Sequence, residues 1–280
     1  MDDKAIVITG ANGQVGRALQ KVYPQALALD REQLDITDQK AINEFNWDNV
    51  KVIINAAAWT DVDGAENPSN YSLVKAVNVD ATRYLATTAS QHDLTFVTFS
   101  SDYVFDGSQP IHNEDEIFSP LNIYGKTKAD GDLAAATATK HYIIRTSWVI
   151  GDGRNFVNIM QDLAMRDIKP SVVNDQIGRL TFTDTLARGI KHLLETNAPY
   201  GTYNLTNEGQ PASWAEIAKI IFEKSGKSSS DVQPVSTAEY FANKPGVAQR
   251  PLQSTLDLTK IERLGFMSEN WQDKLDKLLS

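Results

Sequence analysis

Residues 5–16 of this 280-residue chain read AIVITGANGQVG, an apolar run followed by three regularly spaced glycines. The run Ala5–Thr9 predicts a buried β-strand, and a helix is expected directly after the last glycine. Gly10 suits a tight turn, Gly13 allows the backbone to approach a pyrophosphate, and Gly16 lets the helix pack closely on the sheet. The stretch therefore predicts a strand–turn–helix unit that binds a dinucleotide.

Alternation of strand-like and helix-like segments continues to about residue 150. Such alternation predicts a doubly wound α/β fold with a parallel, Rossmann-type sheet. The expected strands are Ala5–Thr9, Ala26–Leu29, Lys51–Ile54, Thr95–Phe99 and Tyr142–Thr146, and the expected helices are Val15–Val22, Asp38–Phe45, Tyr71–His92 and Ile123–Thr139.

The pattern loosens after Gly151. Strands are expected at Ser171–Asn174 and Gly201–Leu205, and a helix opens at Ser213, where Ser-x-x-Glu predicts a capping box. We assign residues 1–150 to a dinucleotide-binding domain and residues 151–280 mainly to a smaller, interleaved substrate-binding domain. A helix at about 183–196 is expected to return to the first domain.

Composition narrows the kinds of partner. The chain has a net charge of −9 and no basic stripe, which argues against nucleic acid and anionic membranes as partners. It has no cysteine and no apolar run of the roughly 20 residues that span a bilayer, and its first residues lead us to expect no signal peptide. We expect a cytoplasmic protein with a small-molecule ligand. Its four histidines lack ligand-like spacing, so no metal site is expected.

An acidic residue lies where it would meet the cofactor ribose. Asp30 ends the second predicted strand, 20 residues after Gly10. A carboxylate there favours NAD, because it repels the 2′-phosphate of NADP. Arg17 and Arg31 lie close enough in sequence to neutralise that phosphate. The pattern thus leaves NADH and NADPH open, including use of both.

Three Tyr-x-x-x-Lys pairs place a phenol and an ammonium one helical turn apart, at positions 71/75, 124/128 and 240/244. A nearby cation favours the phenolate, so such a pair is expected to lower the tyrosine pKa and to serve in proton transfer. Position selects Tyr124 and Lys128, which follow the fourth strand and its terminal Ser101. Ligands bind beyond such strand ends.

These segments together resemble the extended short-chain dehydrogenases/reductases, and within them the dTDP-4-dehydrorhamnose reductases. The resemblance covers nearly the whole chain. It is carried by residues 10–16, Asn55–Thr60 (NAAAWT), Ser100–Phe105 (SSDYVF), Asn122–Lys128 (NIYGKTK), Arg145–Trp148 (RTSW) and Arg250-Pro251.

The resemblance implies roles for individual residues. Tyr124 would be the catalytic acid, Lys128 would bind the ribose and tune Tyr124, and Ser101 stands where the family usually has Thr. Implied cofactor contacts are Gly13, Gln14, Val15, Asp30, Asp35, Ile36, Ala58, Trp59 and Thr60, with Gly10 and Gly16 from the turn. Implied substrate contacts are Ser101, Asp102 and Trp148, to which Arg250 is added as a candidate clamp for a diphosphate.

The expected reaction is the NAD(P)H-dependent reduction of the 4-keto group of dTDP-4-dehydrorhamnose to dTDP-L-rhamnose, for cell-surface polysaccharide. Two alternatives stay open: a sugar-nucleotide epimerase or dehydratase of the same group, and a non-catalytic regulatory subunit on the same fold. Some relatives form metal-bridged dimers through a glutamate early in the first helix. That helix here reads Val15-Gly16-Arg17-Ala18-Leu19, so a monomer or an unbridged homodimer is expected.

Overall fold

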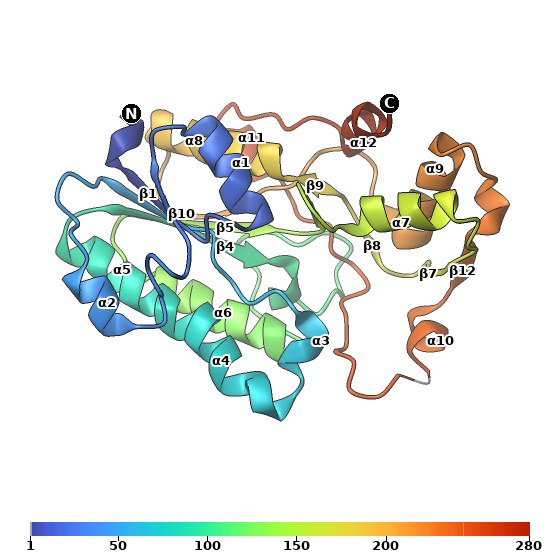
Figure 1. Cartoon of the computed structure of the whole chain (residues 1–280), viewed down its shortest axis with the longest axis horizontal. Coiled ribbons are helices and arrows are strands. Elements are labelled where there is room, and N and C mark those ends of the chain that lie inside the picture. Colours follow the sequence, from blue (N-terminus) through green and yellow to red (C-terminus); the bar gives the residue numbers. More distant parts are fainter. Residues whose placement is uncertain (1, 243) are drawn as a thin grey trace.

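A six-stranded parallel sheet forms the centre of the computed structural model, which describes residues 2–242 and 244–280. The strand order is β10-β5-β4-β3-β1-β2 (Figure 1). Because the chain runs from β1 out to β2 and then returns to β3 on the other side, the order reverses at β1. The predicted fold class is confirmed. The strands span Ile6–Thr9 (β1), Leu27–Leu29 (β2), Val52–Asn55 (β3), Thr95–Ser101 (β4), His141–Thr146 (β5) and Gly201–Asn204 (β10).

Helices cover both faces of the sheet. Helices α1 (Gln14–Val22), α8 (Thr183–Glu195) and α11 (Thr259–Glu262) lie on one face, and α2 (Gln39–Glu44), α5 (Ala81–Gln91) and α6 (Ile123–Ala135) lie on the other (Figure 1). In β1, Ile6 and Ile8 pack on the α1/α8 side, whereas Val7 packs on the α5/α6 side. Burial on both faces explains why the strands read as continuous apolar runs.

The segment predicted as one helix, Tyr71–His92, has a defect at its middle. It comprises α4 (Tyr71–Lys75), a π-helical turn (Ala76–Asp80) and α5. The turn contains Asn78, which is buried and donates to the carbonyl oxygen of Trp59 (3.3 Å) and to Thr127 Oγ1 (3.1 Å). It also accepts from the Trp59 amide (2.9 Å). The π turn therefore joins the Trp59 loop to α6, as such turns often do near functional sites.

Much of the second half forms a separate hydrophobic core, seen at the right of Figure 1. Its helices are α7 (Phe156–Met165), α9 (Trp214–Lys224) and α12 (Trp271–Leu279), joined by short strand pairs. The capping box of Ser213 and Glu216 at the start of α9 is confirmed. Helix α7 was not predicted. The short pairs are β6 (Val149–Ile150) with β9 (Thr181–Phe182), β7 (Ser171–Val173) with β12 (Gln233–Val235), and β8 (Ile177–Gly178) with β11 (Ala212–Ser213).

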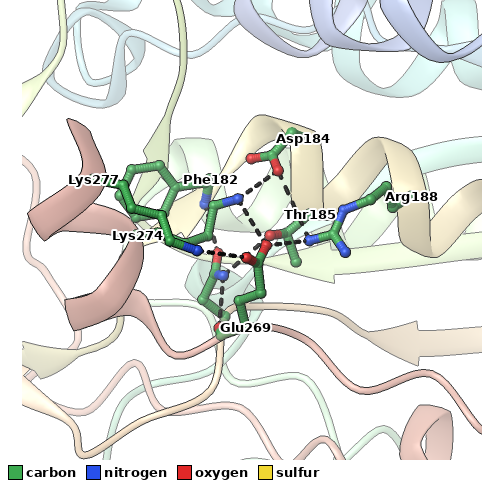
Figure 2. Close-up of polar contacts among 8 residues, drawn as sticks. Phe182, Asp184, Thr185, Arg188, Glu269, Lys274 and Lys277 are labelled. Atoms are coloured by element: carbon green, nitrogen blue, oxygen red, sulfur yellow. Dashed lines mark hydrogen bonds and ion pairs between the residues drawn. The ribbon is translucent and has the colours of Figure 1, made fainter.

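An ionic network ties the C-terminal helix α12 to α8 (Figure 2). Lys274 Nζ contacts a carboxylate oxygen of Asp184 and lies 3.0 Å from Glu269 Oε2, and the same Glu269 oxygen is 2.7 Å from Arg188 Nη2. Lys277, on the rim, reaches Glu269 Oε1 at 3.3 Å. The network connects the second core to a helix that covers the sheet.

No helix within the described ranges is both long and apolar enough to cross a lipid bilayer.

Candidate active site

The glycine-rich turn lies between β1 and α1, at the carboxyl edge of the sheet. Gly10 has φ +72°, and a Cβ atom there would lie 2.5 Å from the backbone nitrogen of Ala57. A Cβ atom on Gly16 would collide with the carbonyl oxygen of Gly10. Both positions therefore require glycine: one for backbone geometry, the other for packing of α1 against the turn. Gly13 is the N-cap of α1, whose first amides are free to bind an anion.

A cavity of about 440 Å³ runs from this turn to the end of β2. Seven of the predicted cofactor residues line it: Gly10, Gly13, Asp30, Asp35, Ile36, Ala58 and Trp59. The Asp30 carboxylate accepts hydrogen bonds from the amides of Glu32 and Gln33 and from Asn12 Nδ2 (3.2 Å). These donors hold the carboxylate at the cavity wall. Gly16 is not among the residues that line this cavity, and it packs against the backbone of Gly10 and Ala11 in the turn.

The two arginines considered for a 2′-phosphate lie differently. Arg31 lines the cavity, and its Nε is 3.1 Å from Asp35 Oδ2. Arg17 is not a lining residue; its guanidinium donates to the backbone carbonyls of Asn12 and Asp152. Arg31 therefore lies at the cavity beside Asp30, whereas Arg17 is held by two backbone carbonyls.

A second cavity of about 480 Å³ holds the predicted catalytic residues. Ser101 ends β4 and Asp102 follows it, while Tyr124 and Lys128 project from the first turns of α6. The first and second cavities share the walls Gly13, Ala56 and Ala58, so they adjoin at the glycine turn. Other predicted residues on the second cavity are Gln14, Val15, Thr60 and Trp148.

Burial governs the ionisation of the tyrosine and the lysine. It raises the pKa of Tyr124 to about 12, and the neighbouring Ser101 hydroxyl acts in the opposite direction. Burial also lowers the pKa of Lys128, which the carboxylate of Asp132 counteracts. The expected net lowering of the tyrosine pKa by its lysine is thus not seen, because desolvation is the largest influence and raises the pKa. Lys128 Nζ donates to the backbone carbonyl of Phe99 at 2.6 Å.

Helix α6 is held tightly at its start. Asn122 caps the helix by accepting from the Gly125 amide at 2.7 Å, and its Nδ2 donates to the Gln249 carbonyl, also at 2.7 Å. A side chain on Gly125 would collide with the carbonyl oxygen of Tyr103. The glycine therefore lets Tyr124 come close to the end of β4, where Ser101 lies.

Ser101 and Asp102 form a buried polar pair at the cavity floor. Ser101 Oγ donates to Asp102 Oδ1 at 2.9 Å and accepts from the amide of Tyr103 at 3.2 Å. Asp102 is only 2% exposed, and burial raises its pKa to about 6. This carboxyl group therefore changes charge near neutral pH beside the predicted catalytic residues.

Trp148 is one of two stacked tryptophans that form an aromatic wall, and the sequence predicted only this one. Its backbone has φ +48°, unusual for a large side chain, and its indole stacks on Trp214 with ring centroids 3.8 Å apart. Trp214 borders both the second cavity and a third one of about 380 Å³. It begins α9, far away in sequence, and no motif marked it.

Arg250 lines the third cavity and is not among the lining residues of the second. It pairs with Asp63 (Nη2–Oδ2, 2.8 Å), donates to the Ala248 carbonyl, and lies over the ring of Phe241. Tyr240 and Lys244, the Tyr-x-x-x-Lys pair nearest the C-terminus, line the same cavity; Lys244 Nζ is 3.5 Å from the centre of the Tyr240 ring. No sequence signal pointed to Asp63, Trp214 or Phe241 as parts of this site. The remaining Tyr-x-x-x-Lys pair, Tyr71 and Lys75, lines none of these three cavities. Tyr71 is 42% exposed, and Lys75 pairs with Asp80.

In the described part of the chain, no three Asp, Glu, His or Cys side chains converge in a way that would hold a metal ion.

The family described as RmlD substrate binding domain matches residues 4–280. A dTDP-4-dehydrorhamnose reductase of Aggregatibacter actinomycetemcomitans is 39% identical, over 98% of this chain and 97% of that protein. The spore coat polysaccharide biosynthesis protein SpsK of Bacillus subtilis is 35% identical, over 98% and 96%.

Solved structures agree with these relatives. A dTDP-4-dehydrorhamnose reductase of Clostridium acetobutylicum superimposes with a TM-score of 0.89 at 36% identity, and the one from Bacillus anthracis, in complex with NADP, with 0.88 at 34%. Each match covers 97% of both chains. The predicted family and enzyme class are thereby confirmed: this oxidoreductase chain belongs to the dTDP-4-dehydrorhamnose reductase family.

Proposed function

We propose that the chain reduces the 4-keto group of dTDP-4-dehydrorhamnose to dTDP-L-rhamnose with NADPH or NADH. One observation carries the proposal: the three cavities adjoin in a row. The first and second share the glycine turn, and the second and third share Trp214. A row of this kind suits a dinucleotide followed by a sugar and its nucleotide.

The residues present fit a nicotinamide dinucleotide. Gly10 offers a turn with no room for a side chain, Gly13 opens a nine-residue helix, and Asp30 closes the far end of the first cavity. In this proposal the pyrophosphate lies at the α1 amides, the adenosine ribose at Asp30, and the nicotinamide ribose at Tyr124 and Lys128. The reduced nicotinamide, when bound, supplies the hydride for the sugar C4.

Residues of the chain then donate the proton and stabilise the charge that its transfer leaves. The raised pKa keeps Tyr124 protonated at neutral pH, so its hydroxyl is ready to donate to the ketone oxygen as negative charge develops there. Ser101 lines the same cavity, and its hydroxyl can donate to the same oxygen once it turns away from Asp102. The Lys128 ammonium stabilises the phenolate that remains. Trp148 and Trp214 wall the space next to the sugar and exclude water.

We assign the third cavity to the nucleotide. Arg250 and Lys244 supply positive charge for the diphosphate, and Tyr240 and Phe241 supply aromatic surface for the base. Residues 1–150, with the helix at about 183–196, form the dinucleotide-binding domain in this proposal, and the remainder of 151–280 mainly binds the sugar nucleotide. Contacts of α8 with α1 and the sheet support the return of that helix, and the addition of β10 to the sheet extends it. The cytoplasmic location, the absence of a metal and the monomeric or dimeric state stay predictions.

The test follows the nicotinamide absorbance while dTDP-4-dehydrorhamnose is added with NADPH or NADH in turn. We expect stoichiometric cofactor oxidation in the wild type. Tyr124→Phe should lose turnover by about a hundredfold or more while binding the cofactor nearly normally. A protein that is isolated with tightly held NAD, and that converts the sugar without net oxidation of cofactor, would instead be the epimerase or dehydratase. Wild-type inactivity with both cofactors would favour the regulatory subunit.

A further inference from the structure

A buried row of charges extends from the active site into the protein. Lys128 and Asp132 lie four residues apart on α6, on the same helical face, and both are buried. Asp132 Oδ2 is 3.0 Å from Nε of Arg145, which projects from β5; the side chains of this pair are 4% and 5% exposed. Burial raises the pKa of Asp132, and the charges of Arg145 and Lys128 act in the opposite direction. With all three groups ionised, the row reads cation, anion, cation, beginning at the active-site ammonium.

The guanidinium of Arg145 contacts several other protein groups besides Asp132. Its Nη1 donates to the Glu114 carbonyl at 2.9 Å, and its guanidinium lies over the rings of Phe105 and Phe118, at 5.3 and 4.9 Å from their centres. A guanidinium held by a carboxylate, a carbonyl and two rings has little freedom to move. It keeps the Asp132 carboxylate in place behind Lys128.

Lys128 itself lacks a carboxylate within ion-pair distance among the described residues; its ammonium donates to the Phe99 carbonyl. A neutral acceptor of this kind cannot balance a buried ammonium, and burial favours the uncharged amine. Asp132 is the group whose charge opposes that effect. The other ionisable groups that line the second cavity are Tyr124 on α6 and, after β4, Asp102 and Tyr103, while the adjoining π turn presents the neutral Asn78.

We propose that Asp132, anchored by Arg145, is the counter-charge that keeps Lys128 an ammonium at working pH. Neither residue lines the second cavity, so both are positioning residues rather than catalytic ones. The inference rests on the proposed function in one respect: it assumes that the Lys128 ammonium stabilises the Tyr124 phenolate during the reaction. With phenol at Tyr124 the row carries one net positive charge; with phenolate the sum is zero. The row thus balances the phenolate that proton donation leaves behind.

The test uses Asp132→Asn, which keeps the shape and an acceptor for Arg145 but removes the charge. The titration of Lys128 is followed by NMR in protein carrying ¹³C-labelled lysine, with Lys128→Met to identify the signal. We expect the midpoint to fall by about one pH unit or more, and the alkaline limb of kcat to move down with it. Asp132→Glu should restore both. Asp130→Asn, the matched control, removes an exposed carboxylate from the same helix and should change neither.

An unchanged Lys128 midpoint in folded Asp132→Asn would overturn the proposal, whatever happens to activity, because the residue would then be merely structural. If that variant does not fold, Asp132→Asn combined with Arg145→Met removes both buried charges and carries the same test. The NMR titration needs neither substrate nor cofactor. A failure of this inference is therefore distinct from a failure of the proposed reaction.

Discussion

The indole of Trp148 stacks on the indole of Trp214, with ring centroids 3.8 Å apart and planes inclined by 16°. One tryptophan follows β5 and the other begins α9, so the pair joins the strand end of the sheet to the second core. Phe156 of α7 packs against Trp214 from another side, at 4.4 Å between centroids. This aromatic group separates the proposed sugar and nucleotide cavities.

Trp214→Leu is expected to weaken the sugar nucleotide selectively. Loss of the stacked wall should cost about 1 kcal/mol of binding, which raises KM for the sugar nucleotide roughly fivefold. Cofactor affinity should hold, because Trp214 lies outside the first cavity. Steady-state kinetics and cofactor titration measure the two effects. Trp214→Phe keeps an aromatic ring and serves as the control; an equal loss of cofactor affinity in Trp214→Leu would contradict the assignment.

Asp102→Asn is expected to stabilise the protein in a pH-dependent way. Burial raises the pKa of Asp102 to about 6 from the ordinary 3.8, so the folded state holds this proton more tightly than the unfolded state does. The stabilisation that protonation provides is complete below about pH 4 and is lost as pH rises through about 6. The variant should therefore melt at the wild-type temperature near pH 4 and at a higher temperature at pH 8. The corresponding gain in the free energy of unfolding at pH 8 is about 3 kcal/mol or less. Thermal melts at both pH values decide this; an equal difference at both would contradict it.

Arg31→Ala is expected to change cofactor preference. Arg31 lines the first cavity beside Asp30, where a 2′-phosphate would lie. Removing its charge should raise the ratio of the dissociation constants for NADPH and NADH about tenfold. Arg17→Ala is the matched control, since Arg17 is engaged with two backbone carbonyls and should leave the ratio unchanged. A shift of equal size in the control would show that general charge, rather than position, selects the phosphate.

Lys274→Met is expected to loosen the attachment of α12 shown in Figure 2. The Lys274 side chain is 12% exposed and contacts both Asp184 and Glu269. Its removal should lower the free energy of unfolding by about 1 kcal/mol at low salt, and by less at high salt. Lys277→Met removes a partner whose side chain is 72% exposed and should have no measurable effect. Equal losses in the two variants, measured by denaturant unfolding, would contradict this view of the network.

Local sequence patterns identified the cofactor end and the catalytic pair. The strand–glycine–helix stretch and the Tyr-x-x-x-Lys spacing are short-range features, and their residues lie next to one another because they share one turn or one helix. The third cavity could not be predicted in this way. Its wall combines Asp63, Phe156, Trp214 and Arg250, which come from four distant segments.

The fold and the chemistry of the site differ in the same way: the fold follows from short-range sequence features, and the site depends on contacts between distant segments. The sequence by itself determined the doubly wound fold, the glycine turn and the Tyr124–Lys128 pair, because each depends on apolar periodicity or on spacing within one element. Only the tertiary structure decided which arginine faces the first cavity, that Trp214 completes the wall, and that Asp132 stands behind Lys128 with Arg145. Burial and charge are properties of surroundings assembled from distant segments, so they set the pKa values of these groups only once the chain has folded.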